Sequence, residues 1–355
     1  MLLNMSNKYI VMIGSELTSP GGISAVATTY KKSGLFEQAK VKYLASYDKP
    51  NKLSMLVKFF ICYMQLFRML MLKKVVCVHV HSASRGSFWR KTVLLQLARF
   101  FGVKTIFHLH SGEFKNYYES CSPKIKKYIS DFLSQVDIVI ALTESWKQVV
   151  LEISPRARVE VVYNPVEEIA GDYQKLNNQI LFLGRLRDTK GLFELIDACA
   201  KLKQQGTEFE LVLAGDGDIE DIRQLCAAKG LADVVKLPGW VDGKAKERLL
   251  LESDIFVLPS YFEGLPIGIL EAMANKVAVI ATDVGGIPDV LTSGQEGLLV
   301  KAKDTNELAE AIKELLQNSE LKNRYINNAY HRASQQFTSQ SVNAALISLY
   351  AQEQS

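Results

Sequence analysis

The sequence predicts an α/β protein with two domains, each built around a parallel sheet covered by helices. The length of 355 residues favours two domains. The residues are 48% hydrophobic and 23% charged, which is the composition of an ordinary globular protein. Along both halves, short apolar runs rich in β-branched residues alternate with longer amphipathic runs, which is the pattern of βαβ units.

Each half contains six predicted strands. In the first half they are Tyr9–Ile13, Val41–Ala45, Val75–Val80, Thr105–Leu109, Asp137–Leu142 and Val159–Val162. In the second half they are Gln179–Leu183, Glu210–Ala214, Val234–Leu237, Asp254–Leu258, Ala278–Ala281 and Gly297–Val300. The longer runs between them predict helices, for example Ser87–Phe101, Leu192–Gln204 and Asn306–Leu316.

A polar stretch between Pro165 and Asn178 separates the two series of strands, and we place the domain boundary there. The first domain is expected to cover residues 1–165 and the second residues 172–335. A further helix is predicted over residues 338–352, after the second sheet.

Charge is distributed unevenly along the chain. The net charge is +4, but residues 1–165 contain 23 Lys and Arg against 10 Asp and Glu. A basic half predicts an anionic partner, which could be nucleic acid, an anionic membrane or a phosphorylated acceptor.

The five cysteines have no metal-ligand spacing and fit a reducing cytosol, and no secretory-signal pattern opens the sequence.

One apolar segment, Leu53 to Leu72, is ambiguous because only Lys58 and Arg68 in it are charged. Its length would permit a membrane span. A lone span within a βαβ series would break the sheet, and both charges would be costly in hydrocarbon. We therefore expect a mostly buried helix of the first domain, with a helix resting on a membrane surface as the alternative.

The most informative motif runs from Glu263 to Glu271, through Gly-Leu-Pro-Ile-Gly-Ile-Leu. Proline is tolerated in the first turn of a helix, so we expect a helix to begin at Pro266. Glu271 then lies more than one turn inside the helix, and Glu263 lies in the loop before it. A helix start attracts phosphate, and two carboxylates beside it could bind the hydroxyls of a sugar nucleotide.

Two other loops can approach a diphosphate. Arg185 and Lys190 lie between a predicted strand and a helix, so both cations can reach the same anion. Gly21 and Gly22 follow the first strand, where glycine permits a tight turn and a close approach of backbone N–H groups to phosphate. The second loop is not G-x-G-x-x-G, so a classical dinucleotide site is not supported.

Four histidines lie near the ends of two predicted strands. His110 is placed at a carboxyl end, where open α/β sheets bind ligands, and His108 lies deeper in the same strand as a structural residue. His79 and His81 either pack in the interior, which we favour, or line an acceptor cleft. A metal site is disfavoured because no Asp, Glu or Cys ligand cluster accompanies them.

Together these motifs resemble the retaining family-4 glycosyltransferases, which belong to glycosyltransferase group 1 and include enzymes of bacterial surface-polysaccharide synthesis. The match covers residues 259–274, the Gly-Arg-x-x-x-x-Lys-Gly loop at 184–191 and the Gly-Gly loop. The resemblance implies the GT-B architecture, with two Rossmann-like domains whose sheets face each other across a cleft. It also implies that the helix at 338–352 crosses back to the first domain, which would bind the acceptor, while the second binds the donor.

The resemblance implies the following roles for individual residues. Glu271 accepts hydrogen bonds from both ribose hydroxyls, and Glu263 holds the sugar hydroxyls. Arg185 and Lys190 stabilise the leaving diphosphate, and His110 contacts the donor sugar. The catalytic set is thus Glu263, His110, Arg185 and Lys190. The donor-binding set is Gly21, Gly22, Gly184, Arg185, Lys190, Gly239, Trp240, Glu263, Gly264, Leu265, Pro266, Ile267 and Glu271.

The implied reaction moves a sugar, with retention, from a UDP- or GDP-linked donor to a saccharide or a lipid-diphosphate-linked acceptor. No cofactor or metal is expected, because Asp216 and Asp218 lack the family context of a metal-binding pair. The expected location is the cytoplasm, with peripheral contact to the inner face of the plasma membrane. That contact would use Lys58, Arg68, Lys73, Lys74, Lys124, Lys126 and Lys127.

Three alternatives stay open at this point. A nucleotide-sugar epimerase can share the architecture, and so can a catalytically silent binding partner. Nucleic-acid binding has only the charge in its favour, without interleaved aromatic residues or a docking motif, and we do not expect it.

Overall fold

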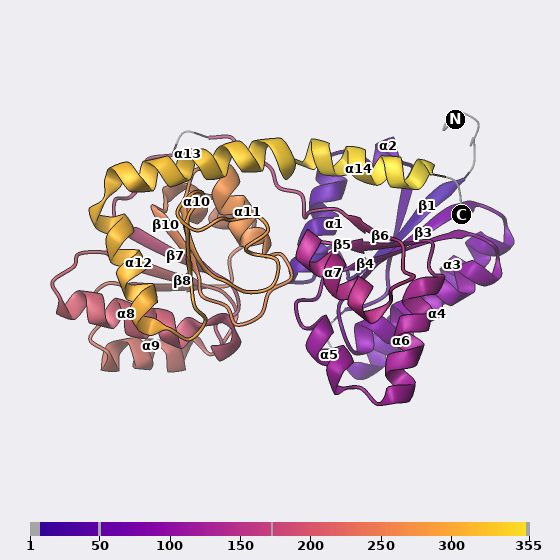
Figure 1. The fold of residues 1–355 in the computed structure, drawn as a ribbon, viewed down its shortest axis with the longest axis horizontal. Coiled ribbons are helices and arrows are strands. Elements are labelled where there is room, and N and C mark those ends of the chain that lie inside the picture. Colours follow the sequence, from indigo (N-terminus) through magenta and orange to yellow (C-terminus); the bar gives the residue numbers. More distant parts are fainter. Residues whose placement is uncertain (1–7, 49–50, 172, 353–355) are drawn as a thin grey trace. The chain divides into compact units, whose positions relative to one another are not determined.

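The computed structural model describes residues 8–48, 51–171 and 173–352. The chain divides into two compact units (Figure 1). The first consists of Met1–Pro165 together with Thr338–Ser355, and the second of Val166–Phe337. Each unit contains one six-stranded sheet, and neighbouring strands in both sheets are parallel.

The first sheet has the strand order β2-β1-β3-β4-β5-β6. Its strands are β1 (Tyr9–Gly14), β2 (Val41–Ala45), β3 (Val75–Ser82), β4 (Lys104–Leu109), β5 (Ile138–Ala141) and β6 (Val159–Val161). Its helices are α1 (Gly22–Lys32), α2 (Leu35–Gln38), α3 (Lys52–Met71), α4 (Gly86–Phe100), α5 (Phe114–Ser120), α6 (Pro123–Gln135), α7 (Glu144–Ile153) and α14 (Ser339–Ala351).

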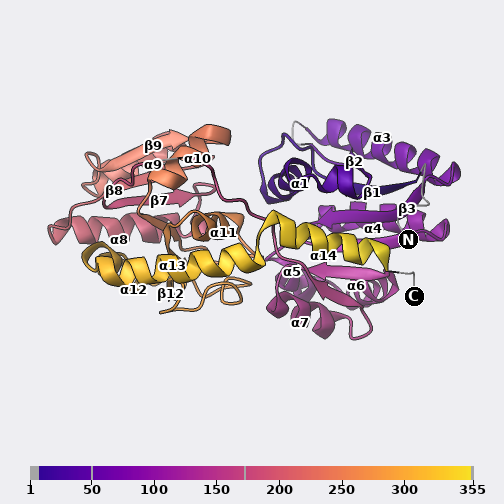
Figure 2. The same ribbon diagram turned by 90° about the horizontal axis from the view of Figure 1, so that it is seen from above.

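The second sheet has the order β12-β11-β10-β7-β8-β9. Its strands are β7 (Gln179–Leu183), β8 (Glu210–Ala214), β9 (Val235–Gly239), β10 (Ile255–Leu258), β11 (Ala278–Thr282) and β12 (Leu298–Val300). Its helices are α8 (Leu192–Gln204), α9 (Ile219–Ala228), α10 (Gly243–Glu252), α11 (Ile267–Ala274), α12 (Thr305–Gln317) and α13 (Ser319–Gln336), besides the 3₁₀ turn η2 (Asp188–Lys190). In this unit α8 and α12 lie side by side (Figures 1 and 2).

All twelve predicted strands are confirmed, and none of their ends differs by more than two residues. The predicted helix at Leu192–Gln204 is confirmed as α8, and those at Ser87–Phe101 and Asn306–Leu316 correspond to α4 and α12 with shifts of one residue. Alternation of apolar runs with amphipathic runs was therefore a sufficient guide to both sheets.

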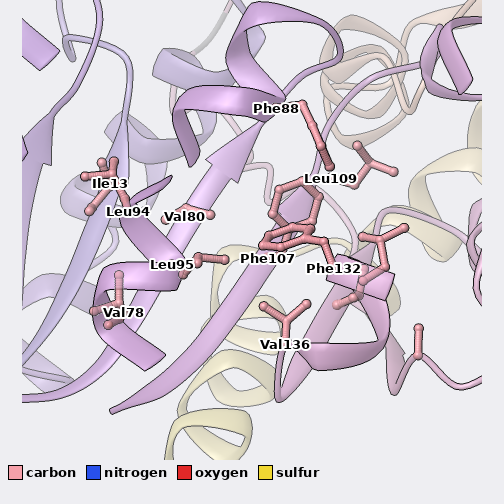
Figure 3. Packing of buried hydrophobic residues seen from close by; sticks show 14 of the residues in the cluster. Ile13, Val78, Val80, Phe88, Leu94, Leu95, Phe107, Leu109, Phe132 and Val136 are labelled. Carbon is pink, nitrogen blue, oxygen red and sulfur yellow. The ribbon is translucent and has the colours of Figure 1, made fainter. Parts of the chain in front are cut away.

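The core of the first unit lies between the sheet and the helices α4 and α6 (Figure 3). Val80 of β3 and Phe107 of β4 point into it together with Phe88 and Phe132, and the rings of Phe88 and Phe107 meet edge to face at 5.7 Å. Because side chains alternate along a strand, the intervening residues of β3 and β4 point to the opposite face of the sheet. This opposite face carries histidines.

The expectation of a mostly buried helix at residues 53–72 is wrong. The helix is present as α3, but only 22% of its apolar window is buried. Its inner side packs through Cys62, Leu66 and Leu70. The helix follows β2, the edge strand of the sheet, so it has neighbours on one side only. By length and composition alone α3 could cross a membrane, but it connects two strands of one sheet.

Candidate functional site

The carboxyl ends of parallel strands meet at one edge of a sheet, which is where α/β proteins bind ligands. In the second unit, the loops after β7 to β11 leave this edge. They bring together the predicted residues of this half. These are Gly184, Arg185 and Lys190 after β7, Gly239 and Trp240 at the end of β9, and Glu263 to Ile267 after β10.

Lys190 and Glu263 form an ion pair, in which Lys190 Nζ lies 2.5 Å from Glu263 Oε1. They come from the loops after β7 and β10, which are neighbouring strands. The Tyr261 N–H donates to the Thr189 carbonyl at 3.0 Å and ties the same two loops together. Both side chains of the pair are largely shielded from water, with 27% and 11% exposed, which makes their attraction stronger than at the open surface.

Two glycines allow the backbone to close tightly around this pair. Gly191 has a φ of +68°, and a Cβ there would lie 1.9 Å from the carbonyl oxygen of Pro259. Gly285 has a φ of +58°, and its Cβ would lie 1.8 Å from the carbonyl oxygen of Glu263. Glycine is therefore required at both places. The loops after β7 and β11 thus pack against the segment from Pro259 to Glu263, which follows β10.

Glu271 lies on α11, whose first residue is Ile267, one position later than predicted, with Pro266 as the N-cap. Its Oε1 accepts a hydrogen bond from Lys246 Nζ at 2.6 Å. Its Oε2 is buried and has no hydrogen-bond partner among the residues that the structure describes. A buried carboxylate oxygen without a donor costs free energy, which a ligand hydroxyl could recover.

Lys246 is a site residue that the sequence reasoning missed. It lies on α10, 25 positions before Glu271. No local pattern joins a lysine on one helix to a glutamate on another, so only the packing of α10 against the rest of the unit reveals the pair.

Arg185 follows Gly184 in the loop after β7, and its Nε lies 3.7 Å from Asp216 Oδ2. Asp216 follows β8, and its carbonyl oxygen accepts from the Leu186 N–H at 2.8 Å. Arg185 is partly exposed and Arg187 is exposed. The guanidinium of Arg185 therefore remains accessible to an anion.

The edge continues to β9. The Gly215 N–H donates to the carbonyl of Gly239 at 2.8 Å, and Gly239 takes a φ of +77°. Trp240 follows with 47% of its surface exposed.

At the start of α11, next to Gly264 and Leu265, the first turn contains no acidic residue. No acidic side chain in the first turn therefore opposes the positive end of this helix dipole.

In the first unit, Gly21 is the N-cap of α1 with a φ of +148°, and Gly22 is the first helical residue. The first turn of α1 contains no acidic residue either. His110 follows β4, and its N–H donates to the Ser82 carbonyl at 2.8 Å. These three residues belong to the first unit, while the other predicted site residues belong to the second.

The histidines of β3 and β4 form a hydrogen-bonded stripe. His81 Nδ1 lies 2.8 Å from His110 Nε2, and His79 Nε2 lies 3.2 Å from His108 Nδ1. His79 Nδ1 also lies 2.7 Å from the Tyr350 hydroxyl of α14. His79, His81 and His108 are fully buried. The prediction that His79 and His81 pack in the interior is therefore confirmed.

Burial lowers the pKa of these imidazoles, to about 3 for His79 and for His110. Within the described residues, His79, His81 and His108 are close enough to share a metal ion, with ligand atoms within 4.8 Å of one another. Both ring nitrogens of His79 already have partners, so His79 could bind a metal only by giving up its contact with His108 or with Tyr350. The arrangement fits neutral histidines bonded to one another.

Comparisons with known proteins extend over both units. Residues 8–168 match the family described as Glycosyltransferase Family 4, and residues 168–332 match Glycosyl transferases group 1. A putative colanic acid biosynthesis glycosyltransferase, WcaL of Salmonella typhimurium, is 32% identical over 179 residues. That alignment spans 48% of this chain and 44% of the relative.

Solved structures share the fold. Sucrose-phosphate synthase from Thermosynechococcus elongatus superimposes with a TM-score of 0.77 at 19% identity, covering 97% of this chain and 98% of that chain. HepE of Anabaena, in complex with UDP and glucose, gives 0.75 at 18% identity, covering 96% and 99%. The chain thus carries a Glycosyltransferase Family 4 domain followed by a Glycosyl transferases group 1 domain, and together the two domains have the GT-B fold.

Proposed function

We propose that this chain is a retaining glycosyltransferase that moves a sugar from a nucleotide diphosphate sugar to a saccharide or lipid-diphosphate-linked acceptor. The proposed role is in polysaccharide or glycoconjugate synthesis. The observation that carries the proposal is the state of the Glu271 carboxylate. One of its oxygens accepts from Lys246, and the other is buried with no partner among the described residues. Vicinal ribose hydroxyls are donors of the right chemistry for that oxygen.

Glu263 and Lys190 neutralise each other in the structure. A bound donor would offer sugar hydroxyls to Glu263 and diphosphate oxygens to Lys190, so both partners could exchange one interaction for another. Gly264, Leu265 and Ile267 surround the start of α11, whose N–H groups would orient the sugar and phosphate. Gly239 and Trp240 would lie at the nucleotide base.

The diphosphate gains negative charge as the sugar leaves. Lys190 and Arg185, together with the start of α11, would stabilise that charge. Preorganised cations and dipoles aimed at developing charge are usually the largest catalytic term. We assign Glu263 to binding sugar hydroxyls and not to covalent attack. The acceptor would then attack from the side of the leaving phosphate, which serves as the base.

Metal independence is part of the proposal. The carboxylate of Asp216 faces Arg185, and that of Asp218 caps α9 by accepting from the Asp221 N–H at 3.2 Å. Both are occupied by protein groups, and this supports a diphosphate neutralised by side-chain cations. The roles of Gly21, Gly22 and His110 at the donor rest on the family resemblance.

The choice of substrates follows the relatives. HepE was crystallised with UDP and glucose, so a UDP-sugar is the first donor to test, with GDP-sugars as the second. WcaL is named for colanic acid biosynthesis, which favours a polysaccharide acceptor. The five cysteines are all free thiols, which supports a reducing cytoplasm as the location.

A thermal-shift panel of UDP-, GDP- and ADP-sugars with a chelator present tests the donor. Stabilisation by one nucleotide class is expected, and a strict requirement for a divalent ion would contradict the proposed mechanism. Turnover of the stabilising donor is then followed by NMR. Slow release of free sugar with the donor's anomeric configuration supports a retaining transferase. An isomeric nucleotide sugar would identify an epimerase, and no turnover with any acceptor would identify a silent partner.

A further inference from the structure

The outer face of α3 is apolar and exposed. Its stripe consists of Leu53, Leu56, Phe60, Met64, Phe67 and Met71, which follow one another at intervals of three or four residues and are all exposed. This spacing places them on one side of the helix. The inner side is also apolar, through Cys62 and Leu66. A helix that is apolar on both sides needs a second apolar environment in addition to the core of its own domain.

The apolar surface extends onto α4. Phe67 of α3 and Phe101 at the end of α4 meet edge to face at 6.0 Å, and Phe100 beside them is 84% exposed. Between Phe60 and Leu72 the stripe encloses a shallow hollow whose only polar lining residues are Gln65 and Arg68. Among the described residues of the first unit, none covers these side chains.

The charges carried by α3 and α4 themselves have one sign. The sequence contains no Asp or Glu between Asp48 and Glu113, so neither α3 nor α4 carries an acid. Arg68, Lys73 and Lys74 lie at the end of α3 and are exposed. Lys58, by contrast, is paired with Glu16 and Asp48, and the predicted role of Lys58 in an anionic contact is therefore not supported by this geometry.

We propose that α3 docks flat on an anionic phospholipid bilayer, with its outer stripe at the level of the acyl chains and Arg68, Lys73 and Lys74 at the headgroup phosphates. An interfacial helix combines an apolar face with cations in this way, and each cation near an anionic surface adds to the affinity. A second copy of the chain is a poorer occupant. A symmetric contact through α3 and α4 would bring like charges together, without a carboxylate on either helix to compensate.

The docking surface does not depend on the proposed reaction, because it involves no donor-site residue. Flotation of the purified chain with vesicles, without donor, tests it directly. We expect binding to vesicles of equal parts phosphatidylcholine and phosphatidylglycerol, weak binding to phosphatidylcholine alone, and loss of binding at high salt. Equal binding to both vesicle types, or to neither, would overturn the proposal.

Variants locate the surface. F60E/M64E on the stripe should lower the bound fraction about tenfold or more, and R68E/K74E should remove the preference for the anionic vesicles. The matched control is F193E, which alters a side chain of α8 in the second unit that is 41% exposed, and it should bind vesicles like the unaltered chain.

All three variants should keep the melting temperature and the thermal shift with the donor, since the altered side chains are exposed and outside the donor site. Vesicle binding that survives F60E/M64E would overturn the proposal. So would a dimer of the unaltered chain that F60E/M64E converts to a monomer without changing vesicle binding, because the face would then serve self-association.

Discussion

Glu271 depends on a residue from another helix for its orientation. Lys246 holds one of its oxygens at 2.6 Å, and the other oxygen is buried and unpartnered among the described residues. If the lysine were removed, the carboxylate would lose the one charged partner that it has among the described residues, in a largely shielded position. Removing one member of a buried ion pair is destabilising, because the remaining charge is left buried without a partner.

Lys246→Met should therefore raise the donor KM about tenfold while changing kcat little, because a ribose contact contributes to ground-state and transition-state binding alike. Steady-state kinetics with the identified donor measure both constants. Lys244→Met alters an exposed lysine of the same helix and should leave both constants unchanged. A fall in kcat with constant KM would place Lys246 at the reacting atoms instead.

Motif reasoning found Glu263, Glu271, Arg185 and Lys190 because they lie within short, recognisable stretches of sequence. It could not find the partners of Glu271 and His110, namely Lys246 and His81, which contact them at long sequence separation. A hydrogen bond between distant residues leaves no periodic trace in a single sequence.

At the scale of elements, the loops that leave the carboxyl edge of the second sheet depend on close backbone contact. Gly285 brings its loop against the carbonyl of Glu263, with a positive φ and no room for a side chain. Gly230 has a comparable φ of +76°, but a Cβ there would meet nothing within 4 Å. Comparing the same substitution at Gly285 and at Gly230 therefore separates the effect of backbone strain from that of steric contact.

Gly285→Ala should lower kcat/KM about 100-fold, because displacing Glu263 by a fraction of an ångström disturbs the reacting geometry. It should also destabilise the protein more than Gly230→Ala, which adds only the backbone strain of a positive φ, about 1–2 kcal/mol. Kinetics and urea denaturation of both variants provide the comparison. Equal losses of activity in the two would show that the contact with Glu263 is unimportant.

The histidine stripe on β3 and β4 predicts an acid-labile element. Unfolded histidine titrates near pH 6.5, whereas burial lowers the pKa of His79 and His110 to about 3. Between these values the unfolded chain binds more protons than the folded chain, so stability falls as the pH is lowered through this window. Each histidine contributes at most about 1.4 kcal/mol per pH unit.

Urea denaturation at pH 7 and pH 5 should therefore show a loss of stability, and His108→Leu should make that loss smaller. His108 is fully buried, and its pKa is lowered by burial and by the neighbouring histidines. His331→Leu changes an exposed histidine of α13 and should preserve the original dependence. A variant at His108 with undiminished pH dependence would contradict this account.

Strand positions were predictable because buried parallel strands are short apolar runs. The exposure of α3 could not be predicted in this way. The apolar pattern of a helix does not show whether its outer face is covered by protein or by another environment. Its place after an edge strand, with neighbours on one side, is a property of the sheet order.

For the whole molecule, the proposal assigns the donor mainly to the second unit. Hydrogen exchange with and without the stabilising nucleotide should show slower exchange at residues 184–191, 239–241 and 263–268. The segment 229–234, which precedes β9 and so lies at the opposite edge of the sheet, should be unchanged. Protection confined to residues of the first unit would contradict the assignment.

The sequence by itself determined the two parallel sheets, the order of their elements and the motif residues at the second unit's carboxyl edge, because strand periodicity and loop motifs are local properties. Only the tertiary structure decided which partners hold those residues and which apolar face stays uncovered. Lys246 on Glu271, His81 on His110 and the open face of α3 all result from packing between segments far apart in the chain, and such packing follows from the assembled sheet and not from neighbouring residues.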